Sequence, residues 1–139
     1  MDTEEIREFF DRDEFAKYCG IKLVEVKTGY AKTEVNIGDE HLNGVETAHG
    51  GVIFTLADFA FAVAANSHGR VTVAINVSIN FIKAARKGKL TAEARELTGN
   101  PKLATYTVDI RDEAGDLVAV FQGLAYRKKV TLETLMNQK

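Results

Sequence analysis

The segment from Gly50 to Asn66 constrains the fold more than any other part of this chain. Its apolar residues fall on nearly every side of a helix: Val52, Ile53, Phe54, Leu56, Ala57, Phe59, Phe61 and Val63. A helix that is apolar all round is stable only where other elements enclose it. Thr55 and Asp58 interrupt the run, which falls short of the roughly 20 residues needed to cross a bilayer. We therefore expect a buried helix in a soluble fold, with no membrane partner.

Strand patterns surround this helix. The stretch Val71–Phe81 alternates apolar and polar residues, which is typical of a strand with one buried face. Three further strands are predicted at Lys89–Leu97, Leu103–Asp112 and Leu117–Lys128, with turns at 99–102 and 113–116. Ahead of the helix, Ile21–Val26 and Ala31–Ile37 predict a hairpin around the turn Thr28-Gly29.

The two ends of the chain predict short helices. Good helix formers in Thr3–Lys17 indicate one or two amphipathic helices, and the tail Thr131–Lys139 indicates a short one. The whole order predicts an α+β fold, with a single antiparallel sheet wrapped around one long central helix. We interpret residues 1–139 as one domain, with 1–18 as an N-terminal helical segment. Because such a sheet has two edges that can pair with another copy, we also expect an oligomer.

Composition excludes several classes of protein. A chain of 139 residues can bury a core without staples, and its single cysteine, Cys19, excludes an intramolecular disulfide framework and favours the reducing cytoplasm. A net charge of −2 with no dense basic stripe argues against a nucleic-acid partner. The N-terminus lacks the basic flank and apolar run of a signal peptide. The three histidines have no zinc-ligand spacing, so we predict no metal site.

The run from Asn43 to Asp58 carries the chemistry. His49-Gly50-Gly51 opens the long helix, where glycines allow close approach to backbone N–H groups at the positive end of the helix dipole. That arrangement suits an oxyanion or another anion. The alternative is that the two glycines only permit a tight turn into the helix.

Asp58 is the one carboxylate in the middle of the apolar helix. An unpaired carboxylate there would cost several kcal/mol of desolvation, so it has either a function or a partner such as a salt bridge or a backbone cap. Asp58 follows Gly51 by seven residues, or roughly 10 Å along a helix axis. One substrate carbonyl cannot easily touch both in one protomer. If both act on it, the simplest arrangement places the helix start of one protomer against Asp58 of another.

Taken in order, these residues resemble the signature of a known family. Asn43 precedes His49-Gly50-Gly51 by six residues, and Phe54, Leu56, Ala57 and Asp58 follow. The later segment FIKAARKGKLTAEAREL resembles the family's segment after its third strand. With this element order over almost the whole chain, the sequence is similar to the hotdog-fold acyl-CoA thioesterases of the PaaI-like (phenylacetate-pathway) and THEM2-like branch.

The resemblance implies roles for individual residues. Asp58 would be the catalytic carboxylate, as general base toward water or as a nucleophile that forms a mixed anhydride. Gly51, together with Gly50, would present backbone N–H groups to the thioester oxygen. Asn43 would place the water or the carboxylate, and His49 would orient the loop rather than carry protons.

The resemblance also implies substrate-binding residues. Lys83, Arg86 and Lys87 would bind the phosphates of coenzyme A, although a solvated turn explains each one alone. Phe81, with Phe54 and Phe61, would line an acyl pocket, unless these rings are core residues. Some relatives carry serine or threonine where this chain has Ala74, and proline where it has Ala84. Asn76 or Ser78 could replace the missing hydroxyl.

The resulting expectation is a homotetramer, built as a dimer of dimers, that hydrolyses aryl-acetyl or medium-chain acyl-CoA. Coenzyme A would enter as part of the substrate, and no other cofactor is expected. One alternative is a hotdog dehydratase acting on hydroxyacyl thioesters, for which His49 is the only available histidine. A second alternative is a non-catalytic acyl-CoA sensor, which the missing hydroxyl at Ala74 favours and the intact Asp58 opposes.

Overall fold

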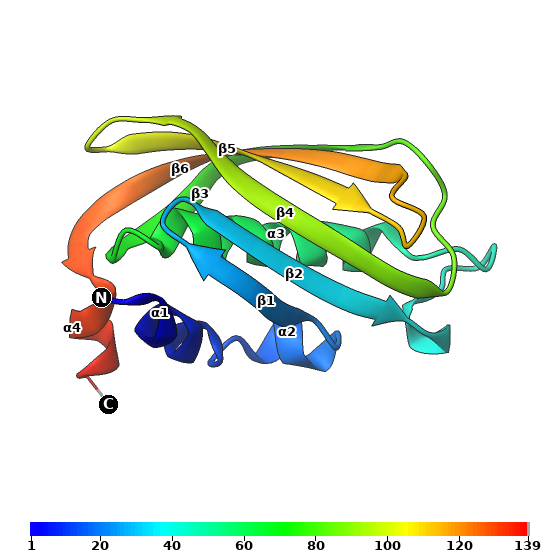
Figure 1. Ribbon diagram of the computed structural model, residues 1–139, viewed down its shortest axis with the longest axis horizontal. Helices are drawn as coiled ribbons and strands as arrows, with labels where there is room; N and C mark the ends of the chain where they lie inside the picture. The colour runs from blue at the N-terminus through cyan, green and yellow to red at the C-terminus, as the bar shows by residue number, and fades with distance from the viewer. Residues whose placement is uncertain (139) are drawn as a thin grey trace.

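A six-stranded antiparallel sheet curves around one long helix in the computed structural model, which describes residues 1–138 (Figure 1). The helices are α1 (Thr3–Phe10), α2 (Glu14–Tyr18), α3 (Gly50–Asn66) and α4 (Leu132–Met136), with a 3-10 turn, η1, at Asp39–His41. The strands are β1 (Lys22–Lys27), β2 (Tyr30–Ile37), β3 (Arg70–Phe81), β4 (Gly88–Gly99), β5 (Leu103–Arg111) and β6 (Leu117–Thr131). Their order in the sheet is β1-β2-β4-β5-β6-β3. This confirms the predicted α+β hotdog-like arrangement and the predicted order of elements.

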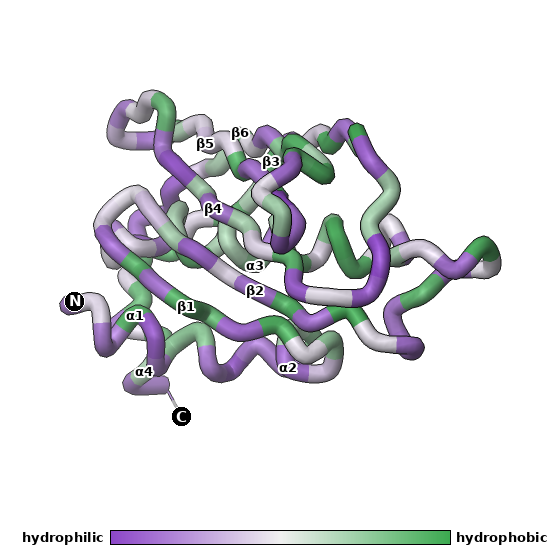
Figure 2. Tube along the Cα trace, turned by 45° about the vertical axis from the view of Figure 1, so that its right-hand side comes forward, coloured by the Kyte–Doolittle hydropathy of each residue, from purple (hydrophilic) through white to green (hydrophobic). Residues whose placement is uncertain are grey.

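The core lies between α3 and the concave face of the sheet. The ring of Phe61 packs against Tyr106 and Phe121, each with ring centroids 5.5 Å apart. Gly123 on β6 makes this contact possible, because a Cβ there would lie only 2.7 Å from the Phe61 ring. Hydrophilic and hydrophobic residues alternate along β1 and β2, as expected for strands with one buried face (Figure 2).

The expectation that α3 is enclosed on every side is wrong in one respect. Most of its residues are buried, but one stripe is incompletely covered: Gly51, Phe54, Thr55, Asp58 and Ala62. Residues three or four apart share one face of a helix, so these five form a continuous surface. The sheet covers the opposite side of α3, and the short helices α1 and α2 cover only part of this one. We call this surface the open stripe.

A bulge in β3 changes the face that its side chains occupy. The register with β6 shifts between Ala74 and Asn76, which leaves Ile75 as the extra residue. Beyond the bulge, Val77 and Ile79 pack against the core, so the intervening polar residues point to the outer face. Ile75 is 55% exposed. The predicted strand is confirmed, but its apolar residues do not all share one face.

The two edges of the sheet differ. At the β1 edge, the guanidinium of Arg7 in α1 donates hydrogen bonds to the carbonyls of Leu23 (2.8 Å) and Val24 (3.2 Å). These bonds satisfy backbone groups that an edge strand otherwise leaves open to another chain. At the other edge, no element among residues 1–138 pairs with the free side of β3. The β3 edge is therefore the more open of the two for pairing.

The terminal segments follow the predictions. The expected N-terminal helices are α1 and α2, each with an aspartate N-cap, and the expected tail helix is α4. Lys139, the last residue of the predicted tail and of the predicted domain, lies outside the described residues. Within residues 1–138, no helix has the length and apolar character needed to span a membrane.

Candidate active site

Asp58 lies on the open stripe, in the third turn of α3. Its side chain is partly buried, and no residue within 1–138 offers it a hydrogen bond or an ion pair. Burial raises the pKa of this carboxyl above its ordinary value, and the charge of Asp13 raises it further. The structure thus supplies no salt-bridge partner that would explain a carboxylate at this position. A raised pKa on a partly buried carboxyl is typical of functional carboxylates.

His49 caps the start of α3. Its backbone is extended (φ −60°, ψ 137°), and its Nδ1 accepts a hydrogen bond from the backbone N–H of Gly51 at 2.8 Å. The imidazole therefore carries no proton on Nδ1. The family resemblance implies Gly51, together with Gly50, as the oxyanion donor, but the Gly51 N–H donates to His49 in this structure. The neighbouring Gly50 N–H has no partner among residues 1–138 and is the free donor at this helix start.

Gly50 also contacts the end of β3. A Cβ at Gly50 would lie 3.3 Å from the ring of Phe81, so the absent side chain lets this ring lie against the helix start. Phe81 is half-exposed and borders a shallow cavity of about 250 Å³ with Gly50 and Lys83. The structure thus brings the predicted residues Gly50 and Phe81 together.

Asn43 organises the loop before α3. Its side-chain oxygen accepts the N–H groups of Val45 and Thr47, at 3.0 and 3.1 Å, and its amide nitrogen donates to the Thr47 hydroxyl at 2.9 Å. These bonds explain an asparagine at this position without reference to Asp58. Its predicted role in placing water or the carboxylate stays a prediction.

A cavity of about 710 Å³ opens beside the start of α3. The residues that line it come from α2, η1 and α3: Phe15, Tyr18, Cys19, Glu40, His41, His49, Gly51, Val52, Phe54 and Thr55. We call it the α2 cavity. Gly51, Phe54 and Thr55 also belong to the open stripe, so the cavity adjoins the surface of α3 that carries Asp58. Sequence reasoning missed its α2 wall; the available signal was the pair of aromatic residues, Phe15 and Tyr18, three apart on a short helix.

The predicted coenzyme A contacts are mostly occupied by acidic partners. The ammonium of Lys83 donates to Asp112 at 2.8 Å and to Asp116 at 2.7 Å. Lys87 forms an ion pair with Asp39. Of the three predicted residues, Arg86 alone is exposed with no acidic partner among the described residues.

Asn76 and Ser78 lie away from Asp58. They pair with Leu124 and Gln122 of β6 and line a cavity on the outer face of the sheet, because the bulge turns them away from α3. Neither side chain can therefore replace the hydroxyl missing at Ala74 within one protomer. The prediction that Asn76 and Ser78 share the face of Ala74 is wrong, because the bulge between them leaves no mark in the alternating sequence.

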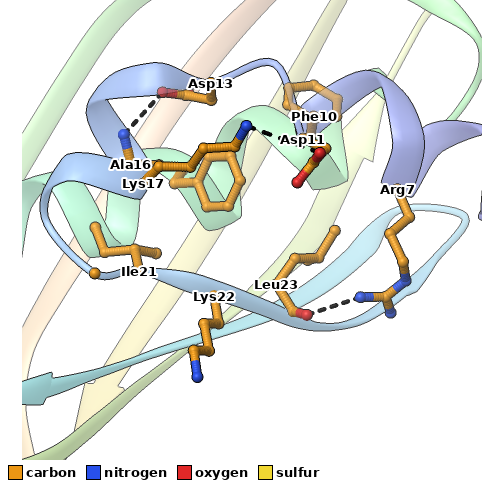
Figure 3. Close-up of a pocket in the computed structure, with 11 residues that line it drawn as sticks. Arg7, Phe10, Asp11, Asp13, Ala16, Lys17, Ile21, Lys22 and Leu23 are labelled. Carbon is orange, nitrogen blue, oxygen red and sulfur yellow. Dashed lines mark hydrogen bonds and ion pairs between the residues drawn. The ribbon is translucent and has the colours of Figure 1, made fainter.

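A second large cavity, of about 500 Å³, lies between α1, α2 and β1 (Figure 3). Most of its charged groups satisfy one another or the backbone: Lys17 pairs with Asp11 at 3.8 Å, and Asp13 accepts the N–H of Ala16 at 3.0 Å. The guanidinium of Arg7, which also lines this cavity, donates to the Leu23 carbonyl at 2.8 Å and so fastens the N-terminal segment to the sheet. Within residues 1–138, no group of three or more His, Cys, Asp or Glu side chains could hold a metal ion.

Comparison with known proteins agrees with this geometry. Residues 46–119, just over half of the chain, match the family model of the thioesterase superfamily. An Archaeoglobus fulgidus protein described as a candidate esterase is 43% identical over 127 residues, covering 90% of this chain and 82% of the relative. The acyl-coenzyme A thioesterase PaaI of Escherichia coli is 34% identical over 119 residues, covering 85% of each protein.

Solved structures agree as well. A structure of E. coli PaaI superposes with a TM-score of 0.89 at 32% identity, covering 92% of this chain and 94% of that chain. Smu.793 of Streptococcus mutans, solved bound to acetyl CoA, superposes with a TM-score of 0.74 at 25% identity, covering 78% and 88%. This chain therefore belongs to the thioesterase superfamily, has the hotdog fold, and is a homologue of the PaaI acyl-CoA thioesterases.

Proposed function

We propose that this protein hydrolyses acyl-CoA thioesters to a free acid and coenzyme A, with Asp58 as its catalytic carboxylate. The observation that carries the proposal is the Asp58 side chain, which is partly buried, has no partner among residues 1–138 and has a raised pKa. The E. coli PaaI relative is named as an acyl-coenzyme A thioesterase, and the Streptococcus mutans relative was solved with acetyl CoA. Both names support acyl-CoA as the substrate class.

Hydrolysis needs a base, an oxyanion donor and a leaving group. Asp58 would take a proton from water, whose oxygen attacks the carbonyl carbon while negative charge develops on the carbonyl oxygen. The free N–H of Gly50, at the positive end of the α3 dipole, would stabilise that charge. The C–S bond then breaks, and the coenzyme A thiolate leaves without a strong general acid. A raised pKa makes Asp58 a better base than an exposed aspartate.

Direct attack by Asp58 remains a second route to the same products. In this route a carboxylate oxygen attacks the carbonyl carbon, the thiolate leaves, and water hydrolyses the mixed anhydride. Both routes use the same carboxylate and the same backbone donor.

The active site would form between two copies of the chain. Asp58 lies roughly two turns beyond Gly50 and Gly51 on one helix, about 10 Å along the axis, so one carbonyl cannot easily reach both. A second copy seated on the open stripe would bring its own helix start toward Asp58. The free β3 edge gives that copy a place to pair, since Arg7 occupies part of the β1 edge. We propose such a dimer, and a dimer of dimers as the complete assembly.

Arg86 is our choice for contact with the coenzyme A phosphates. Its guanidinium is exposed and has no acidic partner in the described part of the chain, whereas the ammonium groups of Lys83 and Lys87 face carboxylates. The acyl group would be aryl-acetyl or medium-chain. A cytoplasmic location, inferred from the lone Cys19, stays a prediction.

Dehydration of a hydroxyacyl thioester is the weaker alternative. It would use a histidine beside a carboxylate as the proton carrier. His49 instead uses Nδ1 to cap Gly51, which suits an orienting role. A non-catalytic sensor would not need a partly buried carboxylate such as Asp58, which has no partner within residues 1–138.

The test is release of free coenzyme A thiol from acetyl-, octanoyl-, palmitoyl- and phenylacetyl-CoA by the wild-type protein. Turnover of at least one thioester is the expected result. Conversion of a hydroxyacyl-CoA to the enoyl-CoA, without thiol release, would show that the protein is a dehydratase and not a thioesterase. Tight binding of an acyl-CoA without any turnover would show that the protein is a non-catalytic acyl-CoA sensor.

A further inference from the structure

The α2 cavity has a polar side and an apolar wall. On α3, His49 and Gly51 lie at the start of the helix, on either side of Gly50, whose N–H would meet the carbonyl oxygen of a thioester. Across the cavity, α2 contributes the aromatic rings of Phe15 and Tyr18. Its volume, about 710 Å³, falls in the range of cavities that bind small organic ligands.

The position of α2 is fixed at both of its ends. Asp13 caps its start by accepting the Ala16 N–H at 3.0 Å, and Ala16 itself is buried against the core. At its other end the Cys19 carbonyl accepts a hydrogen bond from Nε2 of His41, at 2.7 Å. The same imidazole uses Nδ1 to accept the Gly38 N–H at 3.0 Å, which fixes its tautomer. His41 therefore ties α2 to η1 and holds the cavity wall in place.

The aromatic rings on α2 are exposed to an unusual degree. Phe15 is 62% exposed and Tyr18 is 88% exposed. Two large aromatic side chains on one short helix do not contribute to the core when they are this exposed, and exposed apolar patches beside a cavity are typical of ligand contacts. Their neighbours Ala16 and Lys17 face the core and the cavity of Figure 3 instead.

We propose that the α2 cavity is the acyl-binding pocket, and that Phe15 and Tyr18 form the wall that determines which acyl groups are accepted. This inference rests on the proposed thioesterase function. With the thioester carbonyl at the start of α3, a short acyl group ends before it reaches α2. A longer or aromatic acyl group extends across the cavity and covers these rings, burying apolar surface on both sides.

Substitution of the wall gives a kinetic test. The variants Phe15→Ala and Tyr18→Ala lower kcat/KM for octanoyl- and phenylacetyl-CoA by roughly tenfold or more, since lost contacts in an apolar pocket have effects of this size. Acetyl-CoA hydrolysis stays within about twofold of wild type. Phe15→Leu, which keeps an apolar side chain of similar bulk, restores most of the loss.

The matched control lies on the same helix. Lys17→Ala changes an exposed residue of α2 whose side chain lines the cavity of Figure 3. It leaves the ratio between long and short acyl groups unchanged. An equal loss on acetyl- and octanoyl-CoA in the Phe15 and Tyr18 variants would overturn the proposal. So would a change in their assembly mass in solution, because the rings would then contact a second copy.

The lone cysteine gives a second readout that needs no turnover. Cys19 lines the α2 cavity and is partly exposed. An S-octyl thioether of coenzyme A, which cannot be hydrolysed, is expected to slow modification of Cys19 by a maleimide roughly fivefold or more, because it covers the thiol, while free coenzyme A does not. Equal labelling rates with the thioether bound would overturn the pocket assignment. A wild-type protein that protects Cys19 but releases no thiol would overturn the proposed function and leave the pocket intact.

Discussion

The Nδ1 atom of His49 accepts a hydrogen bond from the backbone N–H of Gly51, two residues further along the chain. This bond satisfies one of the unpaired N–H groups at the start of α3 and leaves the Gly50 N–H free to meet a substrate oxygen. It explains a histidine at this position by its capping geometry, without assigning it a proton to carry.

Removal of the His49 cap is expected to weaken the start of α3. His49→Ala lowers the free energy of unfolding by about 1 kcal/mol, the usual cost of losing an N-cap side chain. His49→Asn keeps a side-chain oxygen that can accept the same N–H and recovers most of the stability. Chemical denaturation of the three proteins measures this difference. Equal stability of the alanine and asparagine variants would show that the cap contributes nothing.

The pH dependence of hydrolysis should report on Asp58. The carboxyl must be ionised to act, so kcat/KM rises with pH through an apparent pKa that lies above the ordinary aspartate value, because burial and the charge of Asp13 both raise it. Asp13→Asn removes the charge and keeps a good N-cap for α2. Its profile is expected to shift to lower pH by part of the total displacement, since burial is the larger cause. An unchanged profile would mean that Asp13 does not act on Asp58.

Asp58 is also expected to reduce the stability of the fold. A carboxyl whose pKa is raised on folding favours the folded state below its unfolded pKa, and this contribution is lost as the pH rises through the folded pKa. At neutral pH the ionised carboxylate therefore lowers the free energy of unfolding. Asp58→Asn should raise Tm at pH 7 and have a smaller effect at pH 3. A lower Tm at pH 7 would indicate a stabilising partner for the carboxylate.

Gly123 is expected to tolerate no side chain. A Cβ at this position would lie 2.7 Å from two atoms of the Phe61 ring, so Gly123→Ala overpacks the core and lowers the free energy of unfolding by about 1–3 kcal/mol. In a Phe61→Leu background, which removes the ring, the same alanine is expected to cost less. A double-mutant cycle by denaturation measures the coupling. Additive effects of the two changes would contradict this packing account.

The long helix was the part of the fold that the sequence predicted best. Its apolar pattern and the His-Gly-Gly start gave the bounds Gly50–Asn66 that the structure has. Asp58 stood out for the same reason, because a lone carboxylate contrasts with an apolar helix. The local sequence pattern was sufficient to predict the bounds of the helix and to single out the carboxylate.

Other features depend on contacts between distant segments, and local pattern could not predict them. The β3 bulge reverses the faces of Asn76 and Ser78 through the register with β6. Lys83 meets aspartates from the turn after β5, some thirty residues away. The α2 wall of the cavity exists only because the N-terminal segment folds back over α3.

The central claim is that the Asp58 carboxylate performs the hydrolysis. The most direct measurement is kcat/KM of Asp58→Asn beside wild type, on the acyl-CoA that wild type hydrolyses fastest, by release of coenzyme A thiol. The variant should keep the wild-type assembly mass and circular dichroism spectrum. We predict a loss of at least about a hundredfold, the size expected when a general base is removed. A folded Asp58→Asn protein with wild-type kcat/KM would contradict the account.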